Sequence, residues 1–203
     1  MCKPETISAW ENGEGKYAGE KQAAIEEQYR KLGLDGTRGQ IFCIAWAFDG
    51  GTVKCASQID GDEEADVLRR FLALTREAAF ETPGRPDTIK WVGHNITGFD
   101  LRFIWQRCVV TGVKPVITIP YKAKPWDDNV FDTCIEWKGQ YGSNTSGSMG
   151  AICKAFGIEG KGDMDGSKVY DEYLAGNYQK IIDYCKDDVE RVRQIHKRMT
   201  FSK

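Results

Sequence analysis

The stretch that decides the fold is YQKIIDYCKDDVERVRQIHKRM, residues 178 to 199 of a chain of 203 residues. Its apolar side chains recur with the period of an α-helix and form one stripe: Tyr178, Ile181, Ile182, Cys185, Val189, Val192 and Ile195. At about 100° per residue, Asp188 lies about 70° from the middle of that stripe, Tyr184 about 110° and Asp187 about 170°. The sequence therefore predicts an amphipathic helix with Asp188 and Tyr184 at the edge of its buried face.

Tyr184 and Asp188 stand four residues apart, and residues at that spacing lie on the same side of a helix. The edge of a buried face is where the rim of an active site would lie, so this pair is the first candidate for chemistry. Asp187 falls on the solvent side and is a poor candidate. The alternative interpretation is an ordinary amphipathic helix whose edge carries a partly exposed tyrosine and aspartate.

The composition is that of a soluble globular protein, with 41% hydrophobic and 29% charged residues. With a net charge of −2, the chain as a whole has no positive electrostatic field that would attract nucleic acid. Any binding of nucleic acid must therefore come from a local basic patch. No apolar run approaches the roughly 20 residues of a membrane span, and no secretory signal begins the chain. The seven cysteines are scattered, which favours reduced thiols. We therefore expect a cytoplasmic protein without a membrane partner.

Helices and short strands follow one another along the chain without an internal repeat. Helices are predicted at 19–32, 62–80, 101–111, 129–137, 149–156, 168–174 and 178–199. Strands are predicted at 40–49, 52–59 and 88–93, the first buried on both faces and the first two forming a hairpin. Gly157 should close one helix, and Ser167 should cap another. The sequence predicts one α/β domain over 1–203, a small mixed sheet flanked by helices.

Asp100 is the second candidate for chemistry. It follows the strand 88–93 by a short turn and begins a helix, and α/β proteins place their sites beyond the ends of strands. Asn95 could hydrogen-bond the turn or a substrate. The alternative is that Asp100 is an N-terminal helix residue favoured by the helix dipole. Asp132 could lie near the same site, although we expect it to cap a helix.

Two carboxylates from distant elements, with a tyrosine one turn before one of them, suggest a phosphodiester-cleaving metal site. The chain has only two histidines, so carboxylates would have to hold any metal, which points to Mg²⁺ or Mn²⁺. Two such ions can stabilise the attacking and leaving oxygens together, and the tyrosine hydroxyl would orient the attacking water.

A resemblance to a known family rests on two motifs that occur in that family's order. They are Val92–Leu101, VGHNITGFDL, and Ile182–Val189, IDYCKDDV. The chain resembles the DEDD 3′–5′ exonucleases of the tyrosine-bearing subgroup. Within that group it is most similar to predicted exonucleases related to the proofreading domain of family B DNA polymerases. The intervening matches follow the family's order: Phe131-Asp132, Gly157-Ile158, Gly160-Lys161 and Asp165–Val169. The resemblance covers roughly residues 88 to 200, and more loosely the strand at 41–48.

The resemblance implies an RNase H-like fold, two bound Mg²⁺ or Mn²⁺ ions, and removal of nucleotides from a 3′ end. It assigns the metal to Asp100, Asp188 and Glu5, and orientation of water to Tyr184. Asn95 and Phe99 would bind the substrate, single-stranded DNA or a DNA 3′ end. A DNA polymerase or another replication protein is the implied protein partner. The residues leave the preference for DNA or RNA open, because none of them identifies a 2′-hydroxyl.

The chain departs from the family near its N-terminus, where the family's first motif, Asp-x-Glu-Thr, should stand. It has Lys3-Pro4-Glu5-Thr6 instead, with Lys3 in place of the aspartate and Glu5 in place of the glutamate. We expect that this match is due to chance, that the family's first strand is missing, and that residues 1–39 are atypical. Two divalent ions need more negative charge than Asp100 and Asp188 supply, and Lys3 would repel a cation.

The departure leads to a prediction and leaves an alternative open. The chain should bind metal weakly and cleave slowly or not at all. The alternative is a catalytically inactive protein of the same fold that binds nucleic acid or a replication protein. An upstream strand ending in Asp-x-Glu in the natural gene would favour the enzyme.

Overall fold

The computed structural model describes residues 17–59, 61–81, 89–124, 126–139, 146–160 and 162–202. The chain divides into two units, Met1–Gln40 and Ile41–Lys203, and each is described by itself. The first unit contains helix α2 (Tyr17–Leu32), which ends at the predicted residue. Ion pairs one turn apart stabilise it, with Arg30 2.9 Å from Glu26 and Lys31 2.7 Å from Glu27. All the strands that the structure describes belong to the second unit.

The predicted hairpin is confirmed, with shorter strands than the sequence suggested. Strand β1 (Cys43–Trp46) pairs antiparallel with β2 (Lys54–Ser57), and Cys43 stands opposite Ser57. The expectation of a first strand buried on both faces is only partly right, because Trp46 is buried while the other three residues are half-buried.

The second pair of strands contains one that the sequence did not predict. Strand β3 (Trp91–Gly93) pairs parallel with β4 (Val130–Asp132), and Gly93 stands opposite Asp132. The helix predicted over 129–137 is therefore wrong in its first part, since α5 begins only at Thr133 and ends at Lys138. Val130 and Phe131 favour strand, and Asp132 is extended and caps α5.

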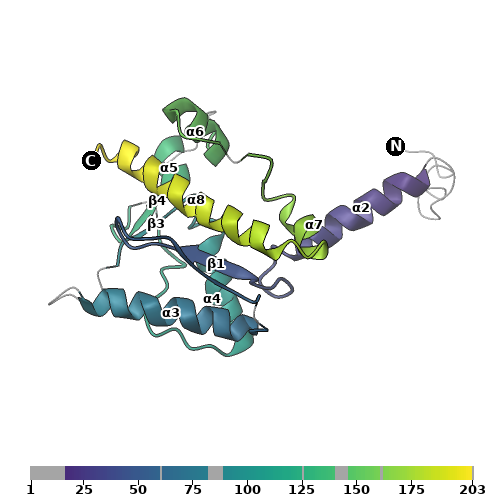
Figure 1. Cartoon of the computed structure of the whole chain (residues 1–203), viewed down its shortest axis with the longest axis horizontal. Coiled ribbons are helices and arrows are strands. Elements are labelled where there is room, and N and C mark those ends of the chain that lie inside the picture. Colours follow the sequence, from purple (N-terminus) through teal and green to yellow (C-terminus); the bar gives the residue numbers. More distant parts are fainter. Residues whose placement is uncertain are drawn as a thin grey trace. The chain divides into compact units, whose positions relative to one another are not determined.

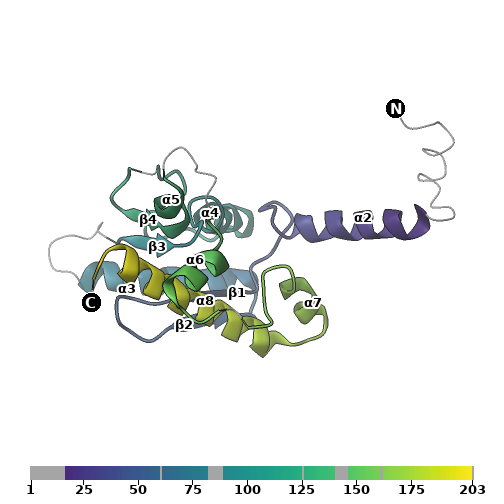
Figure 2. The ribbon, with the colours of Figure 1, turned by 90° about the horizontal axis from the view of Figure 1, so that it is seen from above.

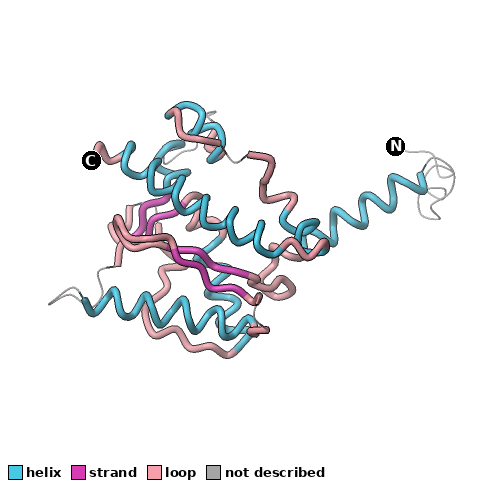
Figure 3. The backbone as a smooth tube through the Cα atoms, in the orientation of Figure 1, coloured by secondary structure: helices cyan, strands magenta, loops and turns pink. Residues whose placement is uncertain are grey.

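The four strands of the described residues form two separate two-stranded sheets, one antiparallel and one parallel (Figure 3). The single mixed sheet of the prediction is thus replaced by two small sheets, while the α/β class is as predicted. The RNase H-like arrangement stays a prediction.

The other described helices of the second unit are α3 (Glu64–Glu81), α4 (Asp100–Thr111), α6 (Met149–Phe156), α7 (Val169–Leu174) and α8 (Tyr178–Met199). α6 and α8 have the predicted bounds, and Gly157 closes α6 at a φ of 70° as expected. Ser167 does not cap α7, because its hydroxyl donates to Asp165 instead and Lys168 occupies the cap position. None of the described helices is long and apolar enough to cross a bilayer.

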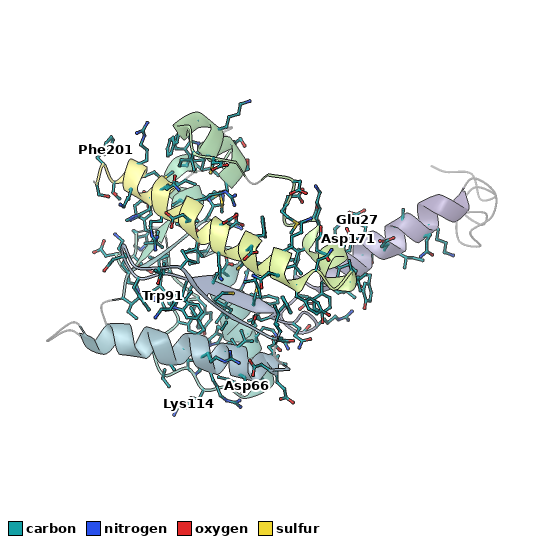
Figure 4. The ribbon with its side chains drawn as sticks, in the orientation of Figure 1. Glu27, Asp66, Trp91, Lys114, Asp171 and Phe201 are labelled. Atoms are coloured by element: carbon teal, nitrogen blue, oxygen red, sulfur yellow. The ribbon has the colours of Figure 1, made fainter. Side chains whose placement is uncertain are left out.

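The core lies on both sides of the hairpin. α8 and α3 each pack against β1 and β2, and Figure 1 shows α8 above the hairpin and α3 below it. The most deeply buried residues between α3 and α4 are Val67, Leu68 and Leu101, each with no exposed surface. Trp91, labelled in Figure 4, lies edge-on against Phe71 with ring centroids 6.2 Å apart. A second cluster joins Ile195 of α8 to Ile152 of α6.

A buried ion pair joins α3 to α4. The Arg107 guanidinium contacts both carboxylate oxygens of Glu64, at 2.8 and 2.6 Å, and Glu64 also accepts a hydrogen bond from the Ile41 backbone at 2.8 Å. This pair ties the chain segment that enters β1 to the two helices below the hairpin. α4 is therefore held firmly at the end opposite to Asp100.

Candidate functional site

The candidate site lies where β3 and β4 end. The two strands are parallel, so their carboxyl ends meet at one edge, the usual place for a site in an α/β protein. β3 continues into the loop 94–99, and α4 then begins at Asp100. β4 ends at Asp132, so parallel pairing brings Asp132 beside the loop that leads to Asp100.

Asp132 holds this loop in place. Its carboxylate accepts hydrogen bonds from the backbone N–H of Asn95 at 2.8 Å, the N–H of Thr97 at 3.1 Å and the Thr97 hydroxyl at 2.7 Å. It also accepts from the N–H groups of Cys134 and Ile135, at 3.0 and 3.4 Å. The predicted capping role is confirmed, and the anchoring of the loop is an addition. Asp132 is 4% exposed, so these bonds are shielded from water.

The shape of the loop requires particular residues. Asn95 has a φ of 57°, in the left-handed region that asparagine tolerates better than most side chains. A Cβ at Gly98 would collide with the Asn95 side chain, and a Cβ at Gly93 would lie 2.6 Å from the Ile96 side chain. His94 Nδ1 lies 2.9 Å from the Thr133 hydroxyl, so His94 has a structural role in the turn.

Asp100 is exposed at the protein surface, but neighbouring groups bury part of its carboxyl. This burial is the main cause that raises its pKa to about 6, and the negative charges of Asp132 and Asp188 add to the effect. A hydrogen bond to the backbone N–H of Asp100 acts in the opposite direction. Charges act strongly on one another only over short distances in salt solution. Of the effects on the Asp100 pKa, that of the Asp188 charge of α8 is the smallest.

Tyr184, Asp187 and Asp188 have the exposures that the helical pattern predicted, whereas Tyr178 of the predicted buried stripe is 38% exposed. Tyr184 and Asp188 are half-buried, whereas the Asp187 side chain is 66% exposed. Asp188 pairs with Arg191 of the next turn, with its Oδ1 atom 3.1 Å from the Arg191 guanidinium. The predicted edge of the buried face thus holds an ion pair.

Arg191 is a site residue that the sequence interpretation missed. It is 9% exposed and donates to the backbone carbonyls of Gly160 at 3.0 Å and Glu159 at 3.4 Å. It thereby joins the loop after α6 to the helix that carries Asp188. An aspartate and an arginine three residues apart on a helix are a known stabilising pair, so the signal was present in the sequence.

The carboxylates of Asp100, Asp132 and Asp188 differ in whether they could bind a divalent cation. Within the residues that the structure describes, no group of three or more His, Cys, Asp or Glu side chains could hold a metal ion. The Asp132 oxygens are engaged by five N–H and O–H donors, and Asp188 adjoins Arg191. Asp100 and Asp188 remain, and one Mg²⁺ ion commonly takes one or two carboxylates and completes its shell with water and phosphate. The residues fit one such ion, and they do not fit two.

The other predicted site residues have different surroundings. Glu5 lies outside the described residues. The exposed Asn95 lies close to Gly98, while Phe99 stacks on Phe103 with ring centroids 5.1 Å apart and packs against the core. The charges of Asp132 and Asp188 thus act on the pKa of Asp100, while much of Phe99 packs against the core.

Comparison with known proteins found one family. The model of a family described as a predicted 3′–5′ exonuclease related to the exonuclease domain of PolB matches residues 40–201. The matched region includes both motifs and begins after Glu5. No curated protein and no solved structure matched the chain.

Proposed function

Because this chain belongs to the family of predicted 3′–5′ exonucleases related to the exonuclease domain of PolB, we propose that it hydrolyses phosphodiester bonds at DNA 3′ ends. We place it in the tyrosine-bearing DEDD subgroup with an RNase H-like fold, on the basis of Tyr184 and Asp188. The observation that supports this most is the family match over residues 40–201, which includes the motifs of both Asp100 and Asp188.

The proposed roles follow from the chemistry of each side chain. Asp100 and Asp188 would hold Mg²⁺ or Mn²⁺, with Glu5 as a further ligand, and the bound cation would stabilise negative charge on the reacting phosphate. With a pKa of about 6, Asp100 is mostly ionised at neutral pH and suited to this role. The Tyr184 phenol would orient the attacking water.

The end of the DNA strand needs its own contacts. Asn95 is exposed on the loop before α4, next to Asp100, and its side-chain amide can hydrogen-bond a nucleotide. Phe99 contributes the part of its ring that the core leaves uncovered. The proposed substrate is single-stranded DNA or a DNA 3′ end, with a DNA polymerase or another replication protein as partner.

A second function has its own support. The described residues lack a three-acid metal group, and Arg191 already neutralises part of the Asp188 charge. Such a chain could bind DNA ends or a replication protein without cleaving them. In line with the deviant first motif, we expect weak metal binding and slow cleavage at best.

Digestion of single-stranded DNA separates the two functions. An oligonucleotide labelled at its 5′ end is incubated with the chain in Mg²⁺ or Mn²⁺, and an RNA of the same sequence is run beside it. The enzyme proposal predicts slow stepwise shortening from the 3′ end that EDTA stops. Asp188→Asn and Asp100→Asn should each reduce the rate by about 100-fold, the size of effect seen when one charge-stabilising group is lost.

Asp187→Asn is the matched control, because Asp187 lies on the same helix with its side chain exposed. It should leave the rate unchanged, which also excludes a contaminating nuclease as the source of the differences. If Asp188→Asn cleaves as fast as the unchanged chain, the proposed active site is wrong. Tight binding of the oligonucleotide with no cleavage would instead favour the second function.

A further inference from the structure

Three half-buried thiols meet between the hairpin and α8. They belong to Cys43 of β1, Cys55 of β2 and Cys185 of α8. Cys43 stands opposite Ser57 and Cys55 opposite Ala45, so the two cysteines share one face of the hairpin as diagonal neighbours. α8 packs against both strands, as the second view shows (Figure 2). The Cys43 thiol interacts with those of both Cys185 and Cys55, and the Cys55 thiol donates to the Ala56 carbonyl at 3.6 Å.

The thiols differ in how readily they ionise. Hydrogen bonds with Cys185 and Cys55 raise the pKa of Cys43. The pKa of Cys55 is lowered, first by its hydrogen bond with Cys43 and then by the nearby Lys186 charge, against the opposing effects of burial and Asp183. Thiolates, not thiols, are the reactive form, so Cys55 is the more nucleophilic of the two.

Cys108 provides a contrast within the same chain. It is 2% exposed on α4, and burial followed by the Glu64 charge raises its pKa to about 11. At neutral pH it is almost entirely protonated. Cys134 and Cys153 are also buried. The reactive thiols of the described residues are thus expected between the hairpin and α8.

We propose that Cys43, Cys55 and Cys185 form a thiol-oxidation site in which a hydroperoxide oxidises Cys55 and Cys43 then closes a disulfide with it. The Cys55 thiolate attacks a peroxide oxygen, the O–O bond breaks, and an alcohol or water leaves once its oxygen is protonated. The product is a sulfenic acid on Cys55. The Cys43 sulfur then attacks the Cys55 sulfur, the S–O bond breaks, and water leaves. Two thiols are oxidised to one disulfide, and one hydroperoxide is reduced to an alcohol and water.

The geometry allows this reaction and also makes it reversible. Diagonal neighbours across an antiparallel pair stand about 7 to 8 Å apart at Cα, slightly more than a relaxed disulfide spans. The strands must therefore move by about 1 Å to close the bond, which should leave it strained and readily reduced. Metal binding fits less well, because no group of three such side chains in the described residues could hold a metal ion.

Cys185 has a supporting part in this site. Cys185 directly follows Tyr184 on α8 and interacts with Cys43 of β1. Closing the disulfide would therefore remove a contact between α8 and the hairpin. The inference concerns the chemistry of the thiols and does not depend on nuclease activity.

Mass spectrometry of the full chain tests the proposal. Cys2 lies outside the described residues and is replaced in all samples by Cys2→Ser. The protein is treated with hydrogen peroxide, the remaining thiols are blocked with N-ethylmaleimide, and the peptides are mapped without reduction. The expected product is a Cys43–Cys55 disulfide that dithiothreitol reverses. It should form at least about tenfold faster than any modification of Cys108, since each pKa unit changes the thiolate fraction about tenfold.

Variants assign the steps. Cys43→Ser should leave Cys55 as a sulfenic acid that dimedone captures, Cys55→Ser should leave Cys43 reduced, and Cys185→Ser should still form the disulfide. The mapping on the otherwise unchanged chain needs no further substitution, so it decides the matter even if a variant fails to fold. A Cys43–Cys185 disulfide as the main product, or Cys108 oxidised as fast as Cys55, would overturn the proposal.

Discussion

The Asp132 carboxylate has more hydrogen-bonding partners than its predicted role as a helix cap requires. Its two oxygens accept from three donors in the loop before α4 and from two backbone N–H groups at the start of α5. One buried carboxylate therefore connects the end of β4 with the loop that carries Asn95 and leads to Asp100. The position of Asp100 depends on a residue that is itself unavailable to substrate.

Asp132→Ala should destabilise the protein by about 3 kcal/mol, because it removes a helix cap and leaves buried N–H groups without an acceptor. Urea unfolding monitored by circular dichroism measures the change. Asp128→Ala, at an exposed position shortly before β4, should alter the free energy of unfolding by less than about 0.5 kcal/mol. Equal effects of the two substitutions would show that Asp132 does not anchor the loop.

Asp100 should make the folded protein less stable when it is ionised. Its pKa is 3.8 in the absence of the fold and about 6 in the folded protein, so folding favours the protonated form. Its stabilising contribution is present below about pH 4 and is lost as the pH rises through about 6. The functional group is thus held at the expense of stability at neutral pH.

Asp100→Asn should therefore increase the free energy of unfolding at pH 7 by about 1 kcal/mol, a value reduced from the full shift because water still screens the carboxyl. The gain should become small near pH 3, below the unfolded pKa of 3.8, where Asp100 is mostly protonated in both states. Urea unfolding at the two pH values, with EDTA present, measures it. A loss of stability at pH 7 would contradict the assigned pKa.

At the scale of elements, the pair of Glu64 and Arg107 fixes α3 against α4. Both side chains are almost fully buried, and each depends on the other for neutralisation. A buried pair of this kind adds little net stability compared with apolar residues, but losing one partner leaves an uncompensated charge. The main effect of the pair is therefore to fix which ends of α3 and α4 meet. Its net contribution to the stability of the protein is small.

Arg107→Met should lower the free energy of unfolding by about 3 to 5 kcal/mol, and adding Glu64→Leu should recover at least about 1 kcal/mol of that loss. Thermal or urea unfolding of the two single variants and the double variant measures the coupling. The matched exposed pair, Arg69 and Asp66 at 2.7 Å, should show a coupling below about 1 kcal/mol. Additive effects at Glu64 and Arg107 would contradict this account.

The sequence predicted some elements well because their signals are local. α8 has a long apolar stripe, and α6 lies between a serine cap and a glycine, so both were predicted with the observed bounds. β4 was missed because it contains only two apolar residues, Val130 and Phe131, and only its pairing with β3 makes it a strand. Arg191 was missed because its partners, the carbonyls of Glu159 and Gly160, lie 31 or more residues away.

At the scale of the whole molecule, the family match and the division of the chain fall at almost the same place. The match begins at residue 40, and the second unit begins at Ile41. Both sheets and the pair of Asp100 and Asp188 belong to this unit. The candidate site was predictable as far as the two motifs and the local pair of Asp188 and Arg191. The hydrogen bonds between Asp132 and the loop before α4, and between Arg191 and the loop after α6, join segments far apart in the sequence.

Glu5 provides a test at this scale, because it lies in the first unit and before the family match. If Glu5 is a metal ligand, Glu5→Gln should weaken Mn²⁺ binding by about tenfold, a usual effect for a change close to a metal. Glu11→Gln, in the same stretch of sequence, is the control and should have no effect. Unchanged Mn²⁺ affinity in Glu5→Gln would exclude Glu5 from the site.

We propose that Asp100 of α4 and Asp188 of α8 hold one divalent cation. Titration with Mn²⁺, followed by electron paramagnetic resonance of the free ion, measures this without relying on nuclease activity. The account predicts one weak site in the unchanged chain, lost in both Asp100→Asn and Asp188→Asn and retained in Asp187→Asn. Equal Mn²⁺ binding by all four proteins would contradict it.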